Sequence, residues 1–220
     1  MPKLTIKNLY KEASAFSALQ SKTSEKDLFG VTDGKAVGTF LEHKFRGYLQ
    51  NRYDFEQGNS ASGIDFPELL VDMKVTSIRQ PQSSCPFKSA RQKIYGLGYS
   101  LLIFVYDKLD DNKKKTATLN ILHTIFVEAE RTADFQTTSG LRQILANQGN
   151  ADDIIAFLQD RNLPADEIEL NNLANEMINN PPIQGFLTIS NALQWRLQYS
   201  RVIERAGLEK GVFSIHRAEQ

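Results

Sequence analysis

The stretch "GIDFPELLVDMKVTS", residues 63–77, combines the pattern of a buried strand with charges that a protein core disfavours. Residues 69–71 are apolar and residues 75–76 are β-branched, which is typical of a strand that begins in the apolar run. Asp72 and Lys74 interrupt this pattern. Because side chains alternate between the two faces of a strand, we expect these two charges on one face, a few ångströms apart.

A third charge, Asp65, precedes Asp72 by seven positions. The residues Phe66-Pro67-Glu68 can form a turn, which would bring Asp65 alongside the Asp72 end of the strand. Two carboxylates and the Lys74 ammonium at a sheet edge offer the hard oxygen ligands of Mg²⁺ and a group that positions a water molecule. The alternative is a solvent-exposed Asp–Lys pair on an edge strand, which contributes little to stability.

The composition indicates an ordinary globular chain. Its 220 residues suffice for one good-sized domain, and 41% hydrophobic with 24% charged residues argues against wholesale disorder. No segment approaches the ~18 apolar residues of a membrane span, and the N-terminus lacks a signal-peptide core, so we expect a cytoplasmic protein with no membrane segment. The single cysteine, Cys85, excludes an intrachain disulfide and a cysteine-based zinc site.

The rest of the chain predicts a mixed α/β domain. Apolar spacing indicates helices over residues 7–22 and 34–52, and "YSLLIFVYDK", Tyr99–Lys108, indicates a buried central strand. A short helix is expected at 88–95 and a strand at 117–129. Helical pieces are expected from about 138 to 206, with breaks at Pro164 and Pro181-Pro182 and the last piece at 191–206. An edge strand is expected at 211–217. This order predicts one domain over residues 1–220, with its sheet in a core at about 34–130 and a helical C-terminal part at about 138–220.

The segment from Asp65 to Lys74 resembles the core motif of the PD-(D/E)xK nuclease superfamily. In this motif an aspartate is followed after six residues by an acidic residue, and one residue later by a lysine. The six-residue gap resembles the mismatch-repair strand-nicking endonuclease MutH and its restriction-enzyme relatives. "GTFLEHKF", residues 38–45, looks like that family's Gly-x-x-x-Glu helix, which implies Glu42 as a carboxylate that points into the site. "RQKI", residues 91–94, looks like its Arg-x-Lys-Leu segment, which implies Lys93 as a second catalytic lysine.

The chain also departs from the pattern of that family. Asp72 stands where a glutamate is usual, and Gly63-Ile64 precedes Asp65 where the superfamily has a proline. Residues 96–99 add length after Lys93. A "GVFSI" segment near the C-terminus resembles the family's Gly-x-Tyr-Leu element only faintly.

The resemblance implies a restriction-endonuclease-like fold, in which helices flank a central mixed β-sheet, and a Mg²⁺-dependent endonuclease. Asp65 and Asp72, with the Met73 carbonyl, would hold the ion, and Lys74 would orient the attacking water. Glu42 would bind a second ion or steer Lys74. The products would carry 5′-phosphate and 3′-hydroxyl ends.

The most specific function implied is a type II restriction enzyme that cuts duplex DNA as a homodimer, because double-strand cleavage of a palindrome favours two-fold symmetry. A monomeric nicking enzyme and a catalytically idle DNA-binding domain are the alternatives. Zero net charge argues against a general nucleic-acid coat protein, but residues 72–115 hold nine Lys or Arg against four Asp or Glu. Candidate DNA contacts in and beyond this segment are Arg79, Gln80, Gln82, Lys88, Arg91, Arg142 and Gln143.

Overall fold

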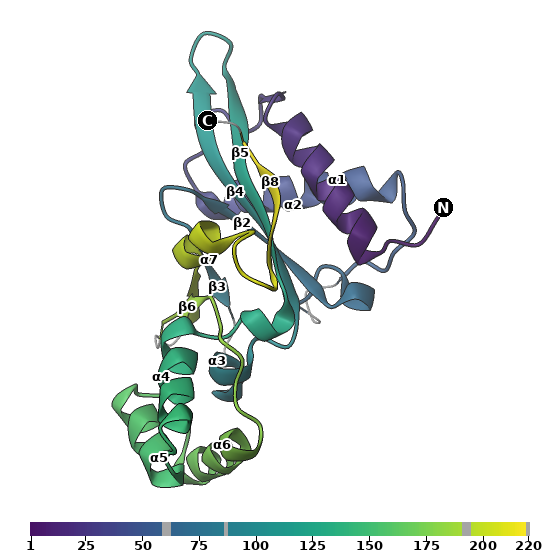
Figure 1. The fold of residues 1–220 in the computed structure, drawn as a ribbon. Helices are drawn as coiled ribbons and strands as arrows, with labels where there is room; N and C mark the ends of the chain where they lie inside the picture. Colours follow the sequence, from purple (N-terminus) through teal and green to yellow (C-terminus); the bar gives the residue numbers. More distant parts are fainter. Residues whose placement is uncertain (59–62, 86–87, 191–194, 219–220) are drawn as a thin grey trace. The chain divides into compact units, whose positions relative to one another are not determined.

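The computed structural model describes residues 1–58, 63–85, 88–190 and 195–218. The chain divides into two compact units that are interleaved in the sequence (Figure 1). Residues 1–82, 101–127 and 203–220 form the first unit, and residues 83–100 and 128–202 form the second. The description of residues 1–220 as one endonuclease domain stays a prediction.

The first unit contains a five-strand sheet with the order β1-β5-β4-β2, in which β8 also pairs with β5. Its members are β1 Ser24–Glu25, β2 Val71–Ser77, β4 Ser100–Asp111, β5 Thr116–Val127 and β8 Val212–Arg217. Strands β4 and β5 form a long antiparallel hairpin with one irregularity between Val105 and Tyr106. Residues 101–105 of β4 are fully buried, so the predicted central strand is confirmed. Strand β2 lies at an edge of this sheet, and the predicted return of residues 211–217 is confirmed by β8.

Two helices pack on the sheet of the first unit. They are α1 Ile6–Gln20 and α2 Gly34–Gln50, which confirm the two predicted N-terminal helices. The Asp33 side chain begins α2 by accepting the backbone N–H groups of Lys35 and Ala36. In α2, Phe45 lies edge-on to Phe104 of β4, with 5.1 Å between the ring centroids. Four apolar residues of α2 lie four positions apart, so they share one face of the helix, and this face is buried against the sheet: Val37, Leu41, Phe45 and Leu49.

The second unit is mainly helical. Its helices are α3 Arg91–Tyr95, α4 Phe135–Ala146, α5 Ala151–Asp160 and α6 Glu167–Asn179. It also contains a small sheet of order β3-β7-β6, formed by Gln82–Cys85, of which Gln82 is counted in the first unit, Trp195–Gln198 and Thr188–Ile189. Asn150 and Asp153 form a capping box at the start of α5. The helices share an apolar core. As predicted, both proline sites lie outside helices. Among the described residues, no helix has the length and apolar character that crossing a membrane requires.

Two predictions of secondary structure are wrong in part. A helix was expected over 191–206. Residues 195–198 instead form strand β7, and only α7, Ser200–Arg205, is helical. Residues 191–194 lie outside the described residues. Trp195 and Leu197 are buried while the residues between and after them are exposed, which is the two-residue period of a strand.

The second error lies just before β2. The turn expected at Phe66-Pro67-Glu68 is present as a short 3-10 helix, Pro67–Leu69. Leu69 and Leu70, however, were expected to begin the strand and lie outside it, and Leu70 adopts a left-handed conformation with φ 51°. The strand therefore begins at Val71.

Candidate active site

Side chains of strand β2 alternate between its two faces, which places apolar residues on one face and charged residues on the other. Val71 and Met73 belong to the apolar core of the first unit, whereas Asp72 and Lys74 lie on the opposite face. Lys74 Nζ lies 2.7 Å from Asp72 Oδ2, which confirms that the two charges share a face. Asp72 is only 4% exposed, and the Lys74 side chain is 22% exposed. The pair is therefore not the solvent-exposed ion pair of the alternative interpretation.

A closed loop brings Asp65 to this strand. Phe66 and Val71 pair as an antiparallel bridge: the Phe66 N–H donates to the Val71 carbonyl at 2.9 Å, and the Val71 N–H donates back at 3.2 Å. The 3-10 turn and the left-handed Leu70 fill the loop between them. Asp65 Oδ2 then accepts the backbone N–H of Met73 at 2.8 Å. The predicted approach of Asp65 to the start of the strand is confirmed.

Helix α2 supplies a second set of charges. Gly38, Glu42 and Arg46 are four residues apart and so form one stripe along the helix, next to its buried apolar stripe. At Gly38 the helix lies close to β2, because a Cβ atom built there would be 3.9 Å from the Cβ of Val75. This close approach places Glu42 and Arg46 beside the charged face of β2.

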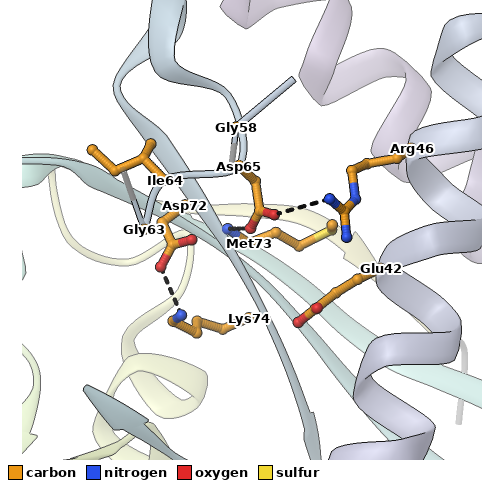
Figure 2. A pocket seen from close by; sticks show the side chains of 9 residues that line it. All are labelled: Glu42, Arg46, Gly58, Gly63, Ile64, Asp65, Asp72, Met73 and Lys74. Carbon is orange, nitrogen blue, oxygen red and sulfur yellow. Dashed lines mark hydrogen bonds and ion pairs between the residues drawn. The ribbon is translucent and has the colours of Figure 1, made fainter. Parts of the chain in front are cut away.

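These elements enclose a pocket of about 320 Å³ (Figure 2). The described residues that line it all belong to the first unit: Glu42, Arg46, Gly58, Gly63, Ile64, Asp65, Asp72, Met73 and Lys74. Figure 2 shows the Asp72 carboxylate directed at Lys74 and the Asp65 carboxylate directed at Arg46 and the Met73 backbone. The structure thus brings together Glu42, Asp65, Asp72 and Lys74.

The electrostatics of the pocket favour added positive charge. Burial, together with nearby Asp65, raises the pKa of Glu42 to about 7. Burial also raises the pKa of Asp72 to about 6, although Lys74 opposes this effect. Burial lowers the pKa of Lys74, but the carboxylates around it outweigh burial, so its pKa is raised and it stays charged at neutral pH. Three carboxyl groups share two cations, Lys74 and Arg46.

The donor set fits Mg²⁺ in its chemistry. Asp72 Oδ2 is buried and contacts Lys74 Nζ at 2.7 Å, and among the described residues no hydrogen bond to this oxygen meets the usual geometry. Carboxylate oxygens are the ligands that Mg²⁺ prefers. In the part of the chain that the structure describes, no three acidic, histidine or cysteine side chains already meet at one metal-binding point. Ligation therefore requires carboxylates to turn toward a common point, because Asp65 now faces the Met73 N–H and Arg46.

Lys93 lies in the second unit, on α3, and does not line the pocket. It is 5% exposed. Burial lowers the pKa of Lys93; Asp134 opposes this effect, and Arg161 adds to it. Its role as a second catalytic lysine stays a prediction.

Arg79 and Gln80, two candidate DNA contacts, are exposed just after β2 in the first unit. Arg79 Nε lies 3.5 Å from Asp107 Oδ1. Arg142 and Gln143 are exposed on α4, where Arg142 donates a hydrogen bond to the Pro182 carbonyl.

Lys88 and Arg91 are exposed in the second unit. Arg91 is already engaged there: its Nη2 lies 2.5 Å from Glu176 Oε1, and its guanidinium lies 4.4 Å from the centre of the Tyr95 ring. Contact of these residues with DNA stays a prediction.

Arg46 is a charged residue of the pocket that the sequence did not indicate. Its position, four residues after Glu42, is the available signal, because residues at this spacing share a helix face. An arginine at this spacing from a glutamate is common on helix surfaces, so the spacing alone does not mark a site.

Comparison with known proteins identifies the family of this chain. The family model described as Type II restriction enzyme NspV matches residues 3–214. The type II restriction enzyme NspV of Nostoc sp. (strain ATCC 29411 / PCC 7524) is 72% identical over 214 residues, which cover 97% of each chain. No solved structure matches. This chain belongs to the family of the type II restriction enzyme NspV.

Proposed function

We propose that this type II restriction enzyme, a sequence-specific DNA endonuclease, hydrolyses DNA in the pocket formed by Asp65, Asp72, Lys74 and Glu42, with Mg²⁺ as its cofactor. The observation that carries the proposal is the convergence of three carboxyl groups and a buried lysine in one cavity, from a loop, a strand and a helix. The same set resembles the motif of the PD-(D/E)xK superfamily and of its MutH branch, to which we assign the site.

Asp65 and Asp72, with the Met73 carbonyl, would hold the metal ion. Mg²⁺, when bound, would stabilise the charge on the phosphoryl group and lower the pKa of a water molecule. Asp72 must be ionised to bind the metal, and the positive charge of Lys74 favours this ionised form.

Lys74 would orient the attacking water. The carboxyl groups around it raise its pKa, so at neutral pH the Lys74 ammonium can donate hydrogen bonds to a water molecule. Glu42, with a pKa of about 7, would bind a second ion or steer Lys74. In-line attack on the phosphodiester would leave 5′-phosphate and 3′-hydroxyl ends.

Residues outside the pocket complete the proposal. Lys93 would act as a second catalytic lysine, and the exposed groups of Arg79, Gln80, Lys88 and Arg91 would contact DNA, mostly through phosphates. Two copies of the chain would cut the two strands of a palindromic site.

Digestion of supercoiled plasmid by the purified protein tests this function. We expect discrete cuts with Mg²⁺, none in EDTA, linear DNA as the main early product, and a mass on DNA near twice the 24.8 kDa of the chain. Nicked circles together with a monomeric mass would contradict the homodimer and favour the nicking alternative. Binding of DNA without any cleavage would contradict catalysis itself.

A further inference from the structure

Among the described residues that line the pocket, Arg46 is a cation that the proposed function does not use. It lies on α2, one helical turn after Glu42, and its side chain is 21% exposed. Figure 2 shows its guanidinium directed into the pocket from the helix, whereas Lys74 enters from β2. Lys74 is closely paired with Asp72 at 2.7 Å, but the nearest approach of Arg46 to Asp65 is 3.9 Å.

The hydrogen-bonding capacity of Arg46 is largely unused. A guanidinium carries five N–H donors in a planar fork. Within the described ranges of the chain, Arg46 Nε is buried and has no hydrogen-bond partner. A buried donor of this kind destabilises a protein unless a partner arrives. Asp65 is not that partner, because its Oδ2 already accepts the Met73 N–H and its Oδ1 lies at the long limit of an ion pair with Arg46.

An anion that enters the pocket and fits a planar fork would supply this partner. A phosphodiester matches both requirements, since its two non-bridging oxygens can accept parallel hydrogen bonds from one guanidinium. Such a contact would also offset the repulsion between an entering phosphate and the three carboxyl groups of the pocket. We propose that Arg46 binds the non-bridging oxygens of the DNA phosphate that is to be cleaved. This inference rests on the proposed function and adds a substrate-binding residue to it.

The first test compares two arginines of the same region of the chain. Arg46→Gln removes a positive charge from the pocket. Arg52→Gln is the matched control, because Arg52 is exposed just beyond the end of α2 and does not line the pocket. Arg52 Nε lies 3.7 Å from Glu12 Oε2. Binding to a duplex that contains a cleavage site mapped with the wild type is measured by fluorescence anisotropy in EDTA, over a series of salt concentrations. Arg46→Gln should weaken binding at least about tenfold and reduce the salt slope by about one per protomer, and Arg52→Gln should change neither.

The second test removes the proposed partner from the DNA. A methylphosphonate at the mapped cleavage position replaces one charged oxygen by a neutral methyl group. If Arg46 contacts this phosphate, the loss caused by Arg46→Gln should disappear on the modified duplex, because the two changes then remove the same interaction. Arg46→Lys, which keeps the charge without the fork, should show an intermediate loss that also disappears.

An equal loss on both duplexes, or no loss on either, would overturn the inference and leave Arg46 as a partner of Asp65 alone. Thermal melting by circular dichroism establishes that each variant is folded, and Arg46→Lys carries the test if Arg46→Gln does not fold. Failure of the wild type to bind or cut duplex DNA would instead overturn the proposed function, and with it this inference.

Discussion

The surroundings of Lys74 and of Lys93 differ in a way that changes the chemistry of each amine. Lys74 lies in the first unit with Asp72 at 2.7 Å, and Asp65 and Glu42 add to the same negative potential. Burial alone would lower its pKa, but these carboxyl groups raise it. The result is a lysine that keeps its charge.

Lys93 lies in the second unit, where burial dominates. One carboxyl group, Asp134, raises its pKa, but this does not compensate for burial, and Arg161 lowers the pKa further. An amine of this kind gives up its proton more readily than Lys74. The carboxyl groups around Lys74 thus outweigh its burial, whereas the one beside Lys93 does not.

The largest expected effect comes from removing the Asp72–Lys74 pair. Lys74→Ala and Asp72→Ala should each lower the cleavage rate by several orders of magnitude while DNA binding is largely retained, since the lost groups act in the transition state. Single-turnover cleavage and anisotropy give the two quantities. Lys113→Ala, in the exposed turn between β4 and β5, is the control. Wild-type-like cutting by either pocket variant would disprove the assignment of the site.

A smaller loss of cleavage is expected when Lys93, the second lysine of the comparison, is replaced. If Lys93 is a second catalytic lysine, Lys93→Ala should reduce cleavage at least about tenfold, which corresponds to about 1.4 kcal/mol of barrier. Circular dichroism should show a folded variant. A loss below about threefold would remove Lys93 from the catalytic set and leave it as a buried residue of the second unit.

The smallest effect is the pH dependence of stability without metal. The pKa of Glu42 is about 7 in the folded protein, above its ordinary value of 4.5, so the folded state holds this proton more tightly than the unfolded state. The stabilisation is present below about pH 4.5 and is lost as the pH rises through about 7. Glu42→Gln should therefore show a smaller fall in Tm between pH 5 and pH 8 than the wild type, by a few degrees.

Differential scanning fluorimetry measures this difference, and added Mg²⁺ should raise the Tm of the wild type at pH 8 because it binds the folded state. A fall in Tm that is identical in the wild type and in Glu42→Gln would exclude Glu42 as its source. The contribution of Lys93 to stability should change with pH in the opposite direction. Because its pKa is lowered in the folded protein, stability should rise with pH in the alkaline range.

The part of the site that the sequence could predict is the part that a local rule governs. Alternation along a strand placed Asp72 with Lys74, and turn chemistry brought Asp65 to them. The longer-range arrangement follows no such rule. The assignment of Lys93 to another unit depends on tertiary packing, and Arg46 carries no sequence signal that separates a pocket residue from an ordinary helix residue.

The same limit explains the errors in secondary structure. In the segment that begins at Trp195, apolar residues at 195, 197, 199 and 202 are compatible with both the two-residue and the 3.6-residue period. Packing of Trp195 and Leu197 in the second unit decides for a strand. At Leu70, an apolar residue was expected to extend, but closure of the loop between Phe66 and Val71 requires a left-handed residue there.

The bridge between Phe66 and Val71 has a consequence for how this family can vary in length. Because the four residues between them are closed at both ends by hydrogen bonds, one inserted or deleted residue would displace Asp65 from the Met73 N–H. The exposed turn at residues 112–115 carries no such constraint. In natural relatives and in designed chimeras, we therefore expect insertions and deletions to be tolerated in that turn and excluded from residues 67–70, so that residues 65–74 are inherited, or grafted, as one block.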